Sequence, residues 1–113
     1  MRKIIQSEEF SNFFHSLPAK AQTKILYALN ILTSLKVVST KLVKRLVGTE
    51  FYELRISVDN EYRIILFCVD KENFMEASQI LLLNGFLKKS TKDYNAELKK
   101  AEKILRSYEN EDR

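Results

Sequence analysis

The hydrophobic periodicity of this chain changes from helical to alternating near residue 50. Over residues 10–35, apolar side chains recur every three or four positions, whereas over residues 51–57 they alternate with polar ones. The first pattern predicts helices and the second predicts a strand. Because each amphipathic element has only one apolar face to bury, a chain with both patterns must pack helices against a sheet.

The helical part divides at Pro18, a residue that suits the first turn of a new helix. We expect a first helix from Ser7, a good N-cap, to about Ser16. A second helix of about five turns follows and ends near Val37. The two helices together predict an N-terminal helical hairpin.

Three strands are expected in the second part of the chain, at residues 51–57, 61–69 and 77–83. Short turns at 59–60 and 70–73 predict an antiparallel meander, and Asn84-Gly85 is expected to end the last strand. Residues 2–6 add a short first strand, and Asp93 is the expected N-cap of a last helix. The predicted fold is a single α+β domain over residues 1–113, with an antiparallel sheet, a C-terminal helix and the order β-α-α-β-β-β-α.

The composition excludes several kinds of site. The one cysteine, Cys68, rules out an internal disulfide, and its apolar neighbours predict a buried side chain. His15 is the only histidine, and no catalytic set is built around it. No P-loop, Gly-rich dinucleotide turn or paired-cysteine motif is present, and a single cysteine excludes a zinc site with four cysteine ligands. Without a signal peptide or a run of about 20 apolar residues, we expect a soluble, cytoplasmic protein with no membrane partner.

The positive charge is concentrated in the first half of the chain. The formal net charge is +4, and the span 10–49 contains no Asp or Glu. Its cations are Lys20, Lys24, Lys36, Lys41, Lys44 and Arg45. A second basic cluster, Lys88, Lys89 and Lys92, follows the third predicted strand. One basic surface of this kind suits a phosphate backbone, and the same clustering also fits an ordinary solvated face.

Arg63 is the most informative charged residue, because it lies inside an otherwise apolar strand. An unpaired buried charge is costly, so Arg63 needs either a partner or a site. Glu53 and Arg55 share one face of the preceding strand. One interpretation is therefore structural, namely an ion pair between Arg63 and Glu53 across the two strands.

The other interpretation is chemical. Cleavage of RNA by attack of the 2′-OH on the adjacent phosphate needs a proton acceptor, a stabilised phosphorane and a proton donor. Arginine binds phosphate through two hydrogen bonds, and a lysine or carboxylate can transfer protons. The candidates for this chemistry are Arg63, Arg55, Lys88, Lys89 and Glu53. Phe86 or Tyr62 is a candidate for stacking on a base, although a single aromatic residue is more typical of a core.

Four short motifs, in order and at ordinary spacing, resemble one family of toxins. They lie at residues 44–49, 51–56, 61–64 and 82–91, and Glu97 and Ala101 follow on the last helix. The pattern resembles the HigB-like, phage-associated branch of the RelE/ParE toxins, which reads "glyELR", "yRi" and "hgFxKKt" before a capped helix. The resemblance covers the chain from Phe10 to about Ala101.

The resemblance implies a RelE-like fold and a toxin that is restrained by a cognate antitoxin. It also implies ribosome-dependent cleavage of mRNA, without metal or organic cofactor. Arg55, Arg63 and Lys88 or Lys89 become the leading phosphate-binding and catalytic residues, with Glu53 as a proton-transfer group or an orienter of Arg55. The RNA-binding candidates are Phe86, Lys41, Lys44, Arg45 and Lys92. The expected partners are a helix-turn-helix antitoxin of the HigA type and mRNA on the ribosome.

The general acid is left without an assignment. Some relatives carry catalytic His and Tyr residues near the C-terminus, and this chain shows no recognisable equivalent, since Tyr94 and Tyr108 lie in no motif. Two alternative functions remain open. One is inhibition of DNA gyrase by binding, as in the ParE branch, and the other is a non-catalytic relative that only binds a partner.

Overall fold

Three consecutive antiparallel strands form the centre of the structure. The computed structural model describes residues 1–89 and 91–111, with the side chains of 91–93 and 111 excepted. β3 (Phe51–Val58) pairs with β4 (Asn60–Cys68), and β4 pairs with β5 (Gln79–Leu87). Asp59 turns the chain between β3 and β4 with a φ of 62°, in the left-handed region that aspartate tolerates better than most residues. The predicted meander is confirmed.

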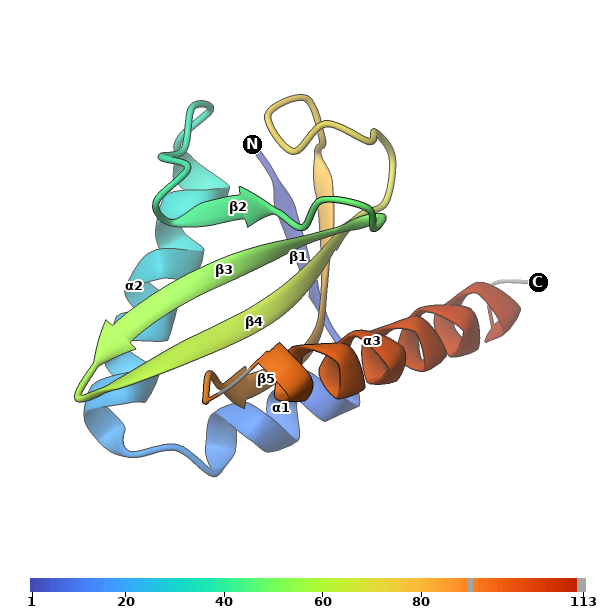
Figure 1. The fold of residues 1–113 in the computed structure, drawn as a ribbon. Coiled ribbons are helices and arrows are strands. Elements are labelled where there is room, and N and C mark those ends of the chain that lie inside the picture. Colours follow the sequence, from blue (N-terminus) through green and yellow to red (C-terminus); the bar gives the residue numbers. More distant parts are fainter. Residues whose placement is uncertain (90, 112–113) are drawn as a thin grey trace.

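Two short strands complete the sheet, whose order is β1-β5-β4-β3-β2 (Figure 1). β2 (Val43–Arg45) is antiparallel to β3, while β1 (Lys3–Gln6) is parallel to β5. The prediction of an antiparallel sheet is therefore correct for β2 to β5 and wrong for β1. The predicted order also lacks β2, because three residues are too few to show an alternation.

Helices cover both faces of the sheet, which confirms the α+β class (Figure 1). α1 (Glu8–His15) and α2 (Ala19–Ser34) form the predicted hairpin on one face, and α3 (Thr91–Glu111) lies on the other. The Ser7 hydroxyl caps α1 by accepting a hydrogen bond from the Phe10 amide at 3.0 Å, as predicted. In the described residues, no helix has the length and apolar character needed to cross a membrane.

The alternation of β3 divides the apolar core into two clusters. Leu54 and Ile56 face α1 and α2, whereas Phe51 faces α3. Cys68 belongs to the first cluster and is buried, as predicted, and burial raises the pKa of its thiol to about 11. The α3 stripe predicted from the sequence packs on the second cluster through Ala101, Ile104 and Leu105.

β5 continues past Asn84-Gly85, the turn pair that was predicted to end this strand. The β4–β5 register shifts between Ile64 and Leu66, so a β-bulge accommodates an extra β5 residue before the strand continues to Leu87. Gly85 marks the close approach of α1: a Cβ at this position would lie 2.3 Å from Cε2 of Phe13. The last helix begins at Thr91, so Asp93 lies in its first turn and is not the N-cap.

Arg2 joins three segments that are distant in the sequence. Its side chain is buried, and its guanidinium donates to Leu32 O at 3.0 Å and to Leu35 O at 2.6 Å, at the end of α2. It also donates to Phe74 O at 3.2 Å, in the long connection between β4 and β5. These contacts tie the start of β1 to α2 and to this connection, which is longer than the turn predicted at residues 70–73.

Candidate functional site

The strand register gathers charged side chains on the sheet face that carries α3. Arg55 pairs with Arg63, Arg63 pairs with Phe86, and Lys44 pairs with Glu53. Directly paired residues project to the same face of a sheet. These five residues therefore lie on one face, although they come from four strands.

Glu53 is the centre of this cluster. Its Oε1 lies 3.1 Å from Nε of Arg55 and 3.9 Å from Nε of Arg63. Glu53 is 3% exposed and Arg63 is 4% exposed, so their charges are balanced by each other and by Arg55 away from water. The ion pair between Arg63 and Glu53, the structural interpretation of Arg63, is confirmed. Its presence does not remove the chemical interpretation, because the same groups can act on a phosphate.

Tyr94, in the first turn of α3, brings a phenol into the cluster. Its hydroxyl donates to Oε2 of Glu53 at 2.7 Å and accepts from Nε of Arg63 at 3.1 Å. The rings of Phe86 and Tyr94 meet edge to face with their centroids 5.1 Å apart, and this contact holds the phenol in position. Burial and the Glu53 carboxylate raise the pKa of Tyr94, so the phenol stays protonated near neutral pH.

Sequence reasoning missed Tyr94. Its position in the sequence could have indicated a role, because Tyr94 follows soon after Lys88-Lys89 at the end of β5 and lies one helical turn before Glu97. The structure shows why that position matters. Asn84, in the bulge of β5, donates through Nδ2 to Glu97 Oε1 at 2.8 Å and to Glu97 O at 3.1 Å. This contact positions α3 along the sheet and so places Tyr94 over Glu53.

Lys88 and Glu61 form the rim of the cluster. The Lys88 amide donates to Glu61 O at 2.8 Å, and Nη1 of Arg63 lies 3.4 Å from Oε1 of Glu61. The Ser57 hydroxyl donates to Glu61, and this bond, aided by the charges of Arg63 and Lys88, lowers the pKa of Glu61. Lys88 is thus an exposed cation next to the cluster, whereas Lys89 is exposed one residue further from β5.

The two predicted stacking residues are buried. Phe86 is 7% exposed and supports Tyr94, and Tyr62 is 3% exposed and packs against Phe13 on the opposite face. Both are strand residues whose side chains are covered by a helix. In this arrangement neither ring offers a free face to a base, and a stacking role for either residue stays a prediction.

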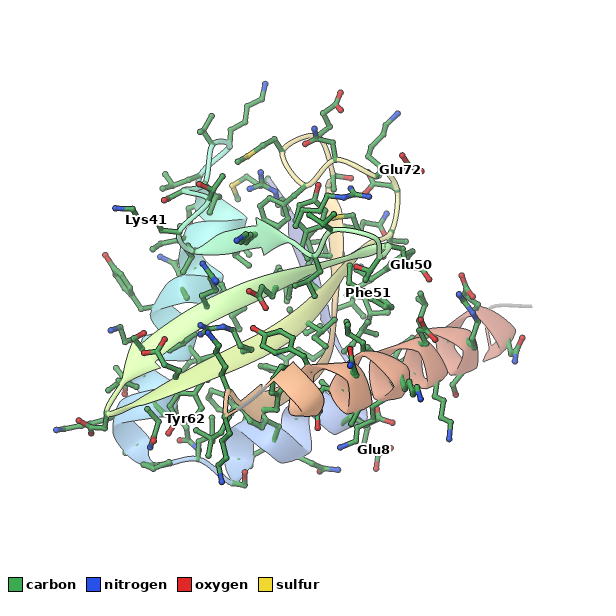
Figure 2. All side chains as sticks on the ribbon, viewed as in Figure 1. Glu8, Lys41, Glu50, Phe51, Tyr62 and Glu72 are labelled. Carbon is green, nitrogen blue, oxygen red and sulfur yellow. The ribbon has the colours of Figure 1, made fainter. Side chains whose placement is uncertain are left out.

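The other predicted RNA-binding residues separate into different places. Lys44 is exposed and lies on the face of the cluster. Arg45 pairs with Tyr52 on the other face, where its guanidinium lies 5.6 Å from the ring centroid. Lys41 lies before β2 at the edge of the sheet and points away from α3 (Figure 2). Lys92 is in the first turn of α3, and its side chain lies outside the described residues.

The cluster combines a carboxylate, a protonated phenol and two guanidinium groups within hydrogen-bonding or ion-pair distance. A carboxylate accepts a proton, a phenol donates one, and guanidinium groups neutralise a phosphate. Arg55 has a side chain that is 33% exposed, so it offers the first contact to an incoming anion. The part of the chain that the structure describes contains no group of three or more His, Cys, Asp or Glu placed to hold a metal ion.

Comparisons with known proteins agree with this fold. The family model described as "Phage derived protein Gp49-like (DUF891)" matches residues 12–106. The isolated E. coli RelE toxin superposes with a TM-score of 0.59 at 14% identity, over 88% of this chain and 97% of that chain. A chain of the intact E. coli RelBE toxin-antitoxin complex superposes with a TM-score of 0.59 at 13% identity, over 80% of this chain and 100% of that one. No curated protein has a significantly similar sequence. The RelE-like fold expected from the sequence is confirmed.

Proposed function

The chain belongs to the phage-derived Gp49-like family, and on that premise we propose that it is the toxin of a toxin–antitoxin pair that stops translation by cutting mRNA on the ribosome. The observation that carries the proposal is the convergence of Glu53, Arg55, Arg63 and Tyr94. The Tyr94 hydroxyl donates to Glu53 and accepts from Arg63, so a proton donor lies beside both the carboxylate and the guanidinium.

In the proposed reaction the 2′-OH of RNA attacks the adjacent phosphorus. Glu53 takes the proton of the 2′-OH, and Arg55 and Arg63 stabilise the additional negative charge of the phosphorane. Tyr94 gives its proton to the 5′-oxygen as the bond from phosphorus to that oxygen breaks. The products are a 2′,3′-cyclic phosphate and a free 5′-OH. Tyr94 keeps its proton near neutral pH, as a general acid must at the start of the reaction, and its hydroxyl lies within hydrogen-bonding distance of Glu53 and Arg63.

Substrate binding has to rearrange the cluster. Glu53 and Arg63 are almost fully buried, and the Tyr94 hydroxyl is hydrogen-bonded to both side chains. The scissile phosphate therefore meets Arg55 and the exposed Lys88 first. It then replaces Glu53 and Tyr94 on Arg63, which frees the carboxylate and the phenol for proton transfer.

The decisive experiment compares Arg63 variants in cell-free translation. We expect the unaltered protein to stop translation and to leave mRNA cut near the ribosomal A site. Arg63→Lys keeps the charge but loses the planar fork, and we expect a loss of about 100-fold or more in cleavage rate. Arg106→Ala, which removes an exposed arginine of α3, serves as the control and is expected to keep full activity.

Full activity in a folded Arg63→Lys protein would contradict the mechanism. Inhibition of gyrase supercoiling, with intact mRNA, would instead support the ParE-type alternative. The proposed partner is a helix-turn-helix antitoxin of the HigA type. Co-expression with such a protein, if encoded beside this chain, is expected to restore growth through a complex that survives gel filtration.

A further inference from the structure

The net positive charge of the chain comes from one segment. Residues 10–49 carry six cations and no acidic residue, whereas the remaining 73 residues carry 13 cations and 15 acidic residues. The segment comprises most of α1, all of α2, the connection that follows and β2 (Figure 1). The α2 and β2 side of the molecule is thus basic, and the rest of the chain is slightly acidic.

The cations of this segment are available to a ligand. All six are exposed, and none forms a salt bridge with an acidic residue that the structure describes. On α2, Lys20, Lys24 and Tyr27 follow at intervals of four and three residues and so share one side of the helix. Tyr27 is 68% exposed and belongs to neither of the two core clusters.

We call Lys20, Lys24 and Tyr27 the α2 stripe. This stripe lies close to the cluster around Glu53, across the edge of the sheet. β2 pairs with β3 only as far as Leu54, so no strand flanks the outer edge of β3 beyond Arg55. At that edge the Lys24 ammonium donates to the carbonyl of Ser57. The hydroxyl of Ser57 donates to Glu61, which in turn pairs with Arg63. Ser57 therefore links the α2 stripe to Glu61, at the rim of the cluster.

We propose that the α2 stripe binds the single-stranded RNA that flanks the cut site, a role that rests on the proposed function. The strand leaves Arg55, passes over the open edge of β3 and runs along α2. The two lysines contact its phosphates, and Tyr27 stacks on a base. A basic track combined with an exposed aromatic ring is the arrangement that holds single strands without regard to sequence. α2 has 16 residues, and its length of about 24 Å accommodates several nucleotides.

Binding of uncleavable RNA of two lengths tests this proposal. The probes are 2′-O-methyl oligouridylates of about 4 and about 16 nucleotides, and fluorescence anisotropy is recorded over a range of salt concentrations. The longer probe is expected to bind the unaltered protein more tightly. In the Lys20→Gln/Lys24→Gln protein, the slope of log K against log salt for the longer probe should fall by about 1.4, because each lost phosphate contact removes about 0.7.

A matched control comes from α3. Lys99→Gln/Lys103→Gln removes the same charge at the same spacing from exposed positions on the other side of the sheet, and we expect the slope to be retained. Tyr27→Ala should weaken binding of the longer probe by about tenfold. Leu26→Ala, which trims the exposed apolar neighbour of Tyr27, should not. Thermal unfolding verifies that each variant is folded.

The outcomes separate this proposal from the proposed function. Two results would overturn the role of the α2 stripe. One is an equal decrease in the salt slope for the two double variants, and the other is tighter binding of the longer probe that persists in Lys20→Gln/Lys24→Gln. Translation arrest by a protein that binds both probes equally would also reject the stripe and leave the toxin activity standing. Stripe-dependent binding in a protein that leaves mRNA intact would support the stripe and reject the nuclease.

Discussion

The hydroxyl of Tyr94 lies 2.7 Å from Oε2 of Glu53, although the two residues are 41 positions apart in the chain. The contact joins the first turn of α3 to the middle of β3. It gives a buried carboxylate one phenol and two guanidinium partners, Arg55 and Arg63. Groups chemically suited to proton transfer and to phosphate binding thereby lie together on one face of the sheet.

Tyr94→Phe removes the hydroxyl and keeps the ring contact with Phe86. We expect RNA cleavage to fall by about 100-fold or more, because the proposed general acid is lost, and the free energy of unfolding to fall by about 1.5–3 kcal/mol, because the hydroxyl bonds a buried carboxylate. Tyr108→Phe, in the same helix, removes a hydroxyl that lies 3.3 Å from Gln6 O, away from the cluster, and should leave cleavage unchanged. Cleavage rates from single-turnover reactions on ribosomes check both variants, and equal rates would exclude Tyr94 as the acid.

Glu53→Ala leaves Arg63 buried without its carboxylate. We expect the free energy of unfolding to fall by about 3–5 kcal/mol. Arg63→Met should cost less, because Glu53 keeps Arg55 at 3.1 Å and Tyr94 at 2.7 Å. In the double variant the loss should be smaller than the sum of the single losses, as urea denaturation can measure. Additive losses would mean that the two charges are not coupled.

Gly85→Ala tests the close approach of α1 to β5. The added Cβ would lie 2.3 Å from the Phe13 ring, so the helix has to shift, and we expect a loss of about 1–3 kcal/mol. Replacing Phe13 with leucine in the same chain should recover part of that loss. Gly48→Asn is a suitable comparison, because a Cβ there meets nothing within 4 Å and asparagine tolerates the positive φ of 81°. Thermal unfolding of the unaltered protein, Gly85→Ala, Gly85→Ala/Phe13→Leu and Gly48→Asn ranks their stabilities and so checks this prediction.

The hydrogen bonds of the Asp70 carboxylate predict a loss of stability at low pH. The Ser78 hydroxyl donates to its Oδ2 at 2.7 Å, and the Ser78 and Gln79 amides donate to its Oδ1 at 3.0 Å each. These bonds lower the pKa of Asp70 from 3.8 to about 2. Because the folded-state pKa is the lower one, the stabilisation is fully present above the unfolded pKa and is lost as pH falls toward 2.

The stability gap between the unaltered protein and Asp70→Asn should therefore narrow as the pH is lowered from about 4 to about 2. Chemical denaturation at several pH values in this window measures the gap. Glu72→Gln, an exposed carboxylate in the same connection between β4 and β5 (Figure 2), is the control and should show no such narrowing. A gap that stays constant across the window would contradict the role of these hydrogen bonds.

Much of the fold was predictable because periodicity is a local property. The alternation over 51–57 placed Leu54 and Ile56 on one face of the strand and Glu53 and Arg55 on the other, and the structure confirms this division. β1 was harder, since a four-residue strand cannot reveal whether its neighbour runs parallel or antiparallel. The predicted end of β5 is wrong, because Asn84-Gly85, a common turn pair, here lies at a β-bulge and at a contact with α1.

The sequence by itself determined the helical hairpin, the three central strands, the apolar stripe of α3 and the candidacy of Glu53, Arg55 and Arg63. Each follows from neighbours within a few positions or from one charge in an apolar strand. Only the tertiary structure decided that Tyr94 completes the cluster, that Phe86 supports it from within the core, and that Arg2 ties β1 to α2. Those relationships depend on strand register and on the docking of α3, and both are set by packing between segments far apart in the chain.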